Sequence, residues 1–171
     1  ERFARAGASV VINCRTTIEK AKETAAAIEA SGGSAIVVQA DVGDKADAQQ
    51  LVEETLRRFD RVDICVNNAG TIIDRPFVES TDEDWDDAMH SNLNAFFYLT
   101  RAVLPHMIER GYGRVLATGS IITEKYDFGP SKMAVSTAAK AGIVTMLRAI
   151  ATEVAPHGIT VNAVSPGYIA T

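Results

Sequence analysis

The side chains best suited to chemistry stand where strand-like apolar runs stop. Asp41 closes one such run and is followed by Val42, and Asn68, Ala69 and Gly70 close the next run, 27 positions after Asp41. Strand ends in an open α/β sheet face the crevice where a dinucleotide binds, and small residues there let backbone approach the ligand closely. We therefore expect a dinucleotide site, although Asp41 read alone could be an ordinary strand-end turn residue.

The second half of the chain adds an amide, a hydroxyl and an amine. Asn92 lies 24 residues after Asn68 inside a helical stretch, and Ser120 lies just past the end of another strand-like run. Lys140 stands in the sequence TAAKAG, and Pro166 and Gly167 follow 26 residues after the lysine. No one of these motifs is specific, because short turns such as Pro-Gly are common. Their shared order and spacing carry the inference.

The elements that must position these residues alternate between short apolar runs and amphipathic stretches. This alternation predicts βαβ units and an α/β fold with a Rossmann-type doubly wound parallel sheet, covered by helices on both faces. Strands are predicted at residues 9–13, 35–40, 62–66, 113–118 and 159–164. Helices are predicted at residues 17–31, 45–59, 82–110 and 134–155, after a helix end at 1–6. Residues 1–171 are expected to form a single domain.

Composition narrows the class of protein. The formal net charge is −5 and no segment is densely basic, so nucleic acid is not an expected partner. No apolar run approaches the ~20 residues of a membrane span, and no membrane association is expected. The three histidines have no metal-ligand spacing, so no metal is expected. Cys14 and Cys65 lie in strand-like runs and are interpreted as free thiols in a reducing cytoplasm.

In this order and spacing the motifs resemble the short-chain dehydrogenase/reductase (SDR) family, most of all its 3-oxoacyl-acyl-carrier-protein reductases and related sugar or alcohol dehydrogenases. The resemblance covers all 171 residues. It implies a first strand with a Gly-rich phosphate loop before Glu1 and a substrate loop after Thr171, so the domain is expected to be incomplete at both ends. It also implies a homo-oligomer, a dimer or tetramer, formed through the helices that begin near Asp82 and Ala134.

The resemblance implies a role for each strand-end residue. The Asp41 carboxylate would accept from the adenine amino group, and Asn68 would contact the ribose. The backbone of Ile169 would meet the nicotinamide amide, which the hydroxyl of Thr171 would support. The complete set of expected cofactor-binding residues is Arg15, Asp41, Val42, Asn68, Ala69, Gly70, Lys140, Pro166, Gly167, Ile169 and Thr171.

The end of the strand at 9–13 should report the phosphate state of the cofactor. NAD enzymes of this kind place an acid there to hold the ribose 2′-hydroxyl. Here the sequence continues as Asn13-Cys14-Arg15-Thr16, with one guanidinium and no acid. A guanidinium can pair with a 2′-phosphate, so NADP(H) is favoured over NAD(H). The alternative is that Arg15 is a solvated loop charge.

The resemblance also implies a catalytic set of Ser, Tyr and Lys, assisted by an Asn, that reduces a ketone or oxidises a secondary alcohol. Ser120 would hold the substrate oxygen, Lys140 would lower the pKa of the tyrosine and bind the ribose, and Asn92 would order a water. The tyrosine should stand four residues before the lysine, on the same helix face. That residue is Ser136, the fourth member of the expected catalytic set.

The substitution at residue 136 leaves two functions open. The chain is either an active oxidoreductase on a small-molecule ketone or alcohol, or an impaired homologue that binds the dinucleotide without efficient turnover. The interval from Ser120 to Ser136 is about three residues longer than is usual in the family. Tyr126 lies in this altered loop and is the one nearby phenol that could substitute as the acid. A module that binds no cofactor would require all the matching residues to be in register by accident.

Overall fold

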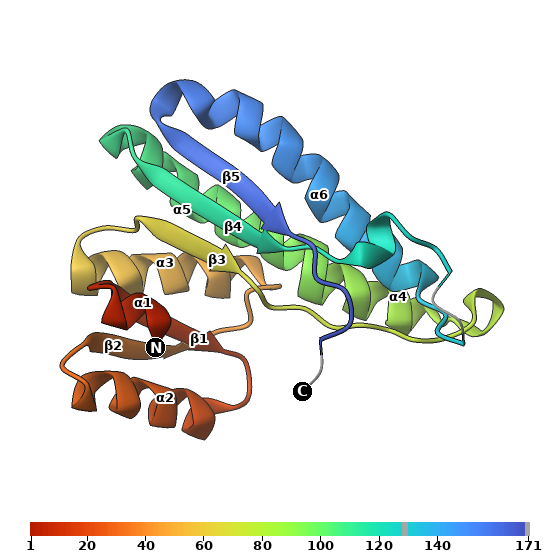
Figure 1. Ribbon diagram of the computed structural model, residues 1–171, viewed down its shortest axis with the longest axis horizontal. Helices are drawn as coiled ribbons and strands as arrows, with labels where there is room; N and C mark the ends of the chain where they lie inside the picture. Colours follow the sequence, from red (N-terminus) through yellow and green to blue (C-terminus); the bar gives the residue numbers. More distant parts are fainter. Residues whose placement is uncertain (128–129, 170–171) are drawn as a thin grey trace.

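The computed structural model of the protein describes residues 1–127 and 130–169 (Figure 1). The strands are β1 (Ser9–Cys14), β2 (Ser34–Gln39), β3 (Ile64–Asn67), β4 (Gly113–Thr118) and β5 (Ile159–Val164). The α-helices are α1 (Arg2–Arg5), α2 (Ile18–Ala30), α3 (Lys45–Phe59), α4 (Asp82–Ala88), α5 (Ala95–Arg110) and α6 (Ala134–Val154). Short helical turns are η1 (Phe77–Glu79), η2 (Met89–Asn94), η3 (Ile121–Thr123) and η4 (Ala155–His157). The predicted alternation of strands and helices is confirmed.

The bounds of α3 follow from its local sequence. The side chain of Asp44 accepts hydrogen bonds from the backbone N–H groups of Ala46 and Asp47, which would otherwise lack partners at the helix start. Asp60 ends the helix in the left-handed conformation, with φ of 62°. The predicted range 45–59 agrees with the observed one because these signals are local.

The predicted helix at 82–110 is not one continuous α-helix. It consists of α4, the π-helical turn η2 and α5, in direct succession. A π turn carries an extra residue in one helical turn, and such turns are frequent at functional sites. Asn92 lies within it.

The five strands form two parallel sheets among the described residues. One sheet has the order β1-β2, and the other has the order β3-β4-β5. All five strands run in the same direction, so their carboxyl ends lie at one edge of the molecule (Figure 1). The parallel α/β architecture agrees with the predicted fold class.

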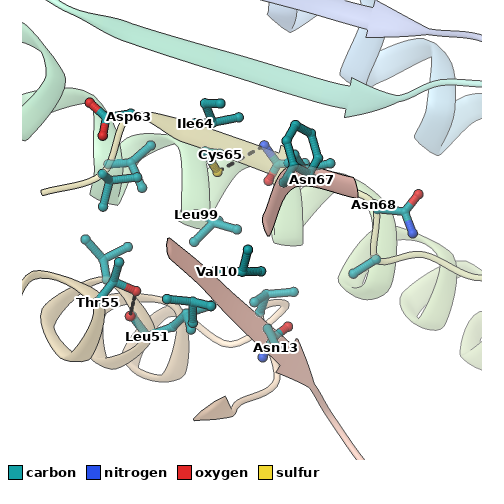
Figure 2. Close-up of a pocket in the computed structure, with 18 of the residues that line it drawn as sticks. Val10, Asn13, Leu51, Thr55, Asp63, Ile64, Cys65, Asn67, Asn68 and Leu99 are labelled. Carbon is teal, nitrogen blue, oxygen red and sulfur yellow. Dashed lines mark hydrogen bonds between the residues drawn. The ribbon is translucent and has the colours of Figure 1, made fainter. Parts of the chain in front are cut away.

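A slot separates the facing edges of β1 and β3. Its volume is about 750 Å³, and residues of both strands line it, among them Val10, Asn13, Ile64 and Cys65 (Figure 2). Helix α3 and helix α5 contribute Leu51 and Leu99 to its walls. Among the described residues, neither of these facing edges has a hydrogen-bonded neighbour.

The helices pack in two layers. Val11 and Val38 pack with Leu51 of α3 and Ala95 of α5 in one cluster. On the other face of the β1-β2 sheet, Val10 and Ile12 pack with Ala4 of α1 and Ile28 of α2. Neighbouring residues of β1 therefore point to opposite helix layers, as expected for a strand buried on both faces.

The face of β3-β4-β5 opposite to α5 and α6 departs from the prediction. Ile64, Val66 and Val164 on this face are 41%, 45% and 64% exposed, whereas the intervening Cys65 is buried. The expectation that the strands would be covered on both faces is therefore wrong for this sheet within the described residues.

Helix α6 is the main apolar helix of the fold. Together with η4 it is long and apolar enough to cross a membrane by length and composition alone. Its residues Ile143, Leu147 and Val154 belong to the largest core cluster, with Val115 of β4. These contacts account for the apolar residues on the buried face of α6.

Candidate active site

Most of the expected site residues lie at or just after strand ends, along one edge of the molecule. The hydroxyl of Thr118, at the end of β4, donates to Asn68 Oδ1 at 2.8 Å. The backbone N–H of Ile121 donates to the Pro166 carbonyl at 3.0 Å. These bonds join the segments that follow β3, β4 and β5, so residues far apart in the sequence share one edge.

Lys140 reaches this edge from α6. Lys140 is only 6% exposed, and its Nζ atom donates a hydrogen bond to the carbonyl of Thr118 at 2.9 Å. Burial lowers the pKa of Lys140 below its ordinary value. The ammonium group therefore lies at the end of β4, next to the carbonyl of Thr118, which is two positions before Ser120.

Asn92 is held firmly by the π turn. The side-chain amide donates to the carbonyls of Thr71 and Ala88 at 3.0 and 2.9 Å. Because both amide protons face carbonyl oxygens, the position of Oδ1 is determined as well. Asn92 is 1% exposed, and Oδ1 has no hydrogen-bond partner among the described residues.

Gly70 brings Asn92 and Lys140 together. A Cβ atom on Gly70 would collide with Asn92 Oδ1 and would come within 3.2 Å of Lys140 Nζ. Oδ1 and Nζ therefore flank the same small space beside the Gly70 backbone. Only glycine leaves this space open.

Ser120 caps the turn η3. Its hydroxyl accepts a long hydrogen bond of 3.4 Å from the N–H of Ile122, and the residue is 9% exposed. A contact of that length is weak and leaves the hydroxyl able to bond elsewhere. Ser120 is thus placed at the edge where the sequence located it.

Ser136 makes a different set of contacts. The residue is fully buried, and Oγ accepts from the N–H of Ile73 at 2.7 Å. Its hydroxyl donates to the Ile73 carbonyl at 3.3 Å. The hydroxyl is therefore engaged on both its donor and acceptor sides by the segment that follows β3.

Tyr126, in the loop that follows η3, takes part in none of the hydrogen bonds described above. It is 80% exposed, and its hydroxyl donates to the carbonyl of Thr123 at 3.2 Å. It lines a second cavity of about 400 Å³ with Phe77, Met133 and Thr137.

The expected adenine end is built around Asp41. Oδ1 accepts from the N–H of Gly43 at 3.0 Å, and Oδ2 lies 3.1 Å from His90 Nε2 and 3.6 Å from Arg15 Nη1. Burial raises the pKa of Asp41, but the bonds from His90 and Gly43 and the nearby Arg15 outweigh it, so the pKa is lowered. The ionised form of the carboxylate is therefore favoured, with the Arg15 guanidinium nearby.

His90 is the site residue that sequence reasoning missed, since it was interpreted as a scattered histidine without a role. Its ring lies over Gly43, where a Cβ would come within 2.6 Å of the imidazole. The signal that could have found it is its place two residues before Asn92, in the same π turn.

The remaining cofactor-binding predictions fall at the same edge. Val42 is buried, whereas Arg15, Asn68 and Ala69 are exposed. After β5, Gly167 and Ile169 are exposed, and Pro166 is half-buried. Thr171 lies outside the described residues. Among residues 1–127 and 130–169, no three His, Cys, Asp or Glu side chains gather as a metal site would require.

The two cysteines are free thiols, as predicted. Cys65 is buried, and desolvation raises its pKa to about 12, which makes the thiol inert near neutral pH. Cys14 is half-buried at the end of β1.

Comparison with known proteins gives one consistent result. The family model described as short chain dehydrogenase matches residues 1–171. A 3-oxoacyl-(acyl-carrier-protein) reductase from Synechocystis sp. is 38% identical over 169 residues, which is 99% of this chain and 67% of the relative. An acetoacetyl-CoA reductase from Allochromatium vinosum is 36% identical and is covered to 68%.

Solved structures agree with these relatives. A short-chain dehydrogenase/reductase from Burkholderia xenovorans superposes with a TM-score of 0.90 at 32% identity, covering 99% of this chain and 66% of that one. A short chain dehydrogenase from Burkholderia cenocepacia in complex with NADP gives 0.89 at 32% identity, covering 97% and 66%. The chain thus spans about two thirds of the length of the proteins it matches.

Proposed function

This chain belongs to the short-chain dehydrogenase family, and we propose that it is an NADP(H)-dependent oxidoreductase that interconverts a ketone and a secondary alcohol by hydride transfer. One arrangement carries this proposal. Asn92 Oδ1 and Lys140 Nζ flank the Gly70 backbone, and Lys140 is bonded to the strand that leads into Ser120. Such a set of amide, ammonium and hydroxyl groups can hold and protonate a carbonyl oxygen.

Each residue has a distinct part in the proposed reaction. The dinucleotide supplies or accepts the hydride when it is bound. The bare backbone at Gly70 fits a closely approaching ribose, whose hydroxyls Lys140 would hold. The hydroxyl of Ser120 would bind the substrate oxygen, and Asn92 Oδ1 would hold a water.

The preference for NADP(H) over NAD(H) rests on Arg15. Its guanidinium is more than half exposed and makes one loose ion pair, 3.6 Å from Asp41. A pair of that length can be exchanged for a 2′-phosphate, and the strand end offers no acid that would bind a 2′-hydroxyl. Asp41 would meanwhile accept from the adenine amino group.

The substrate class follows from the relatives and the second cavity. Reductases of 3-oxoacyl and acetoacetyl thioesters act on a ketone next to an acyl chain. The cavity beside the start of α6 is lined by Phe77, Tyr126, Met133 and Ala134 and by the polar residues Asp127, Ser131, Lys132 and Thr137, the last of which is the neighbour of Ser136. We propose that the acyl part of a 3-oxoacyl-type substrate lies there.

A second candidate function is favoured by the contacts of Ser136. Its hydroxyl is engaged by the Ile73 backbone, and no phenol occupies the position one turn before Lys140. This favours an impaired homologue that binds the dinucleotide without efficient turnover.

We further propose a cytoplasmic homo-oligomer, either a dimer or a tetramer. Trp85 of α4 and Phe97 and Ile108 of α5 are 49%, 37% and 37% exposed. Their exposure supports a subunit contact on these helices.

The test of the proposed function is the reduction of a panel of 3-oxoacyl thioesters and small ketones with NADPH, followed at 340 nm, with dinucleotide affinity measured by fluorescence titration. Turnover at least tenfold above that of Lys140→Met is expected. Dinucleotide binding without such turnover would select the impaired homologue. Absence of dinucleotide binding would refute both candidates.

A further inference from the structure

The tyrosine that donates the proton in this family is replaced here by Ser136, and the Ser136 hydroxyl already makes hydrogen bonds within the protein. Ser136 Oγ accepts from one backbone group of Ile73 and donates to the other. The residue is fully buried, and Ile73 packs against the cluster of Ala88, Val135 and Ala139. Donation from Ser136 to a substrate would break this local packing and leave a buried backbone group unpaired.

A neighbouring pair of groups is not occupied in this way. Asn92 Oδ1 is buried and without a partner among the described residues, an unusual state for a polar atom in a protein interior. Both protons of its amide are spent on the carbonyls of Thr71 and Ala88, so the side chain cannot turn to satisfy the oxygen within the protein. A water is the simplest partner that fits this position.

Lys140 offers the proton that such a water could carry. Its ammonium has three protons, of which one is directed to the Thr118 carbonyl. It lies on the far side of the same space, next to the point where a Gly70 side chain would stand. Lys140, a water and Asn92 Oδ1 can therefore form one hydrogen-bonded chain in front of Gly70.

We propose that Lys140 is the general acid of this protein, and that it protonates the substrate oxygen through a water held against Asn92 Oδ1. The inference rests on the proposed function, because it needs a bound ketone and a bound reduced dinucleotide. It assigns to the lysine itself the proton transfer that the family entrusts to a tyrosine.

The step balances as follows. The carbonyl carbon accepts a hydride from the reduced dinucleotide, the C=O π bond breaks, and its electron pair takes a proton from the water. The water takes a proton from the Lys140 ammonium, which becomes a neutral amine and is recharged from solvent. In alcohol oxidation, the neutral amine of Lys140 removes the proton by the same route in reverse.

The burial of Lys140 supports this role. Desolvation lowers its pKa, so the ammonium is more acidic than an exposed lysine and the amine is accessible at lower pH. General acids work best when their pKa lies near the working pH. An arginine at this position would keep the positive charge for ribose binding but could not give up its proton.

The decisive experiment compares Lys140→Arg and Lys140→Met with Lys45→Arg, a matched change at an exposed lysine at the start of α3. We expect Lys140→Arg to lower kcat by about 10²–10⁴ while NADPH affinity changes less than fivefold. Lys140→Met should lose both turnover and affinity, and Lys45→Arg should change neither. Tyr126→Phe keeps the ring that lines the second cavity and removes only the hydroxyl, so it tests whether this phenol is the acid instead; its loss of kcat should be far smaller than that of Lys140→Arg.

A readout that does not depend on turnover accompanies these variants. The pKa of Lys140, measured by NMR of lysine-labelled protein without cofactor, should lie below the ordinary value for lysine and should coincide with the alkaline limb of kcat/KM for reduction. A normal Lys140 pKa, or kcat retained within threefold in Lys140→Arg, would overturn the proposal. A hundredfold loss in Tyr126→Phe would overturn it too, by assigning the proton to that phenol. Each of these results is distinct from failure of the proposed function, in which the unaltered protein shows no turnover at all.

Discussion

His90 Nε2 lies 3.1 Å from Asp41 Oδ2 and joins the π turn that carries Asn92 to the end of β2. The two residues are 49 positions apart in the sequence. Gly43 makes the contact possible, because any side chain there would enter the space of the imidazole ring. The expected adenine site and the π turn that carries Asn92 are thereby connected by one side chain.

This contact predicts a change in acid stability. Because the pKa of Asp41 is lowered in the folded state, the ionised carboxylate stabilises the fold above the unfolded pKa of about 3.9, and this stabilisation is lost as pH falls through the folded-state pKa. We expect His90→Ala to raise the pKa of Asp41 and to shift the loss of stability to higher pH. Carboxyl titration by NMR and urea unfolding between pH 2 and 6 would measure both. An unchanged Asp41 pKa, or an equal shift in the control His157→Ala, would contradict it.

Arg15 predicts the cofactor preference. We expect NADPH to bind more tightly than NADH, and Arg15→Ala to weaken NADPH binding by about tenfold or more, the order of one charge-assisted hydrogen bond of about 1.5–3 kcal/mol. NADH affinity should change less than threefold, because the 2′-phosphate is absent. Arg57→Ala serves as the control, since Arg57 pairs with Glu54 on the surface of α3. Equal affinities of the parent protein for the two dinucleotides would show that Arg15 is a solvated loop charge.

Adding one methyl group at Gly70 is expected to reduce function. In Gly70→Ala the new Cβ would collide with Asn92 Oδ1 and crowd Lys140 Nζ. We expect kcat and dinucleotide affinity each to fall at least tenfold. Gly111→Ala is the contrast, because its Cβ would meet nothing within 4 Å but its φ of 64° is strained. That variant should lose about 1 kcal/mol of stability and keep its activity. Normal kinetics in Gly70→Ala would place the cofactor elsewhere.

Ser136 predicts a stability effect. Ser136→Ala removes the partner of the Ile73 N–H, and an unpaired buried donor costs about 1–3 kcal/mol. Chemical unfolding should show this loss, together with faster hydrogen exchange at the Ile73 amide. Ser80→Ala, which removes a single long hydrogen bond of 3.3 Å at an exposed site, should stay within about 0.5 kcal/mol. Equal stability of Ser136→Ala and the parent would refute the structural role.

The slot between β1 and β3 predicts poor stability of the 171-residue chain on its own. In the part of the chain that the structure describes, neither facing strand edge has a hydrogen-bonded neighbour, and the slot between them has a volume of about 750 Å³. We expect a broad thermal transition and fast hydrogen exchange at residues 9–14 and 64–67. Native-like protection of these amides, with a cooperative transition, would contradict the prediction.

Local signals explain which elements were predicted with accuracy. Helix α3 has an acidic cap and a regular apolar stripe, and the strands β4 and β5 were predicted with their observed bounds, because short apolar runs between turn residues define them. The π turn at Met89–Asn94 carries no such signal, since its residues are compatible with an α-helix.

By itself, the sequence determined the alternation of strands and helices along the chain, the strand ends that carry Asp41, Asn68 and Ser120, and the one-turn spacing of residue 136 from Lys140. These properties depend on periodicity and on neighbours a few residues apart. Only the tertiary structure decided that Ser136 bonds to Ile73, that His90 bonds to Asp41, and that Asn92 Oδ1 remains unpartnered next to Gly70. Each of these contacts joins residues more than 20 positions apart, and its geometry follows from how the helices dock on the sheet. Side-chain identity specifies which bonds a residue can make, whereas packing selects which of them it does make.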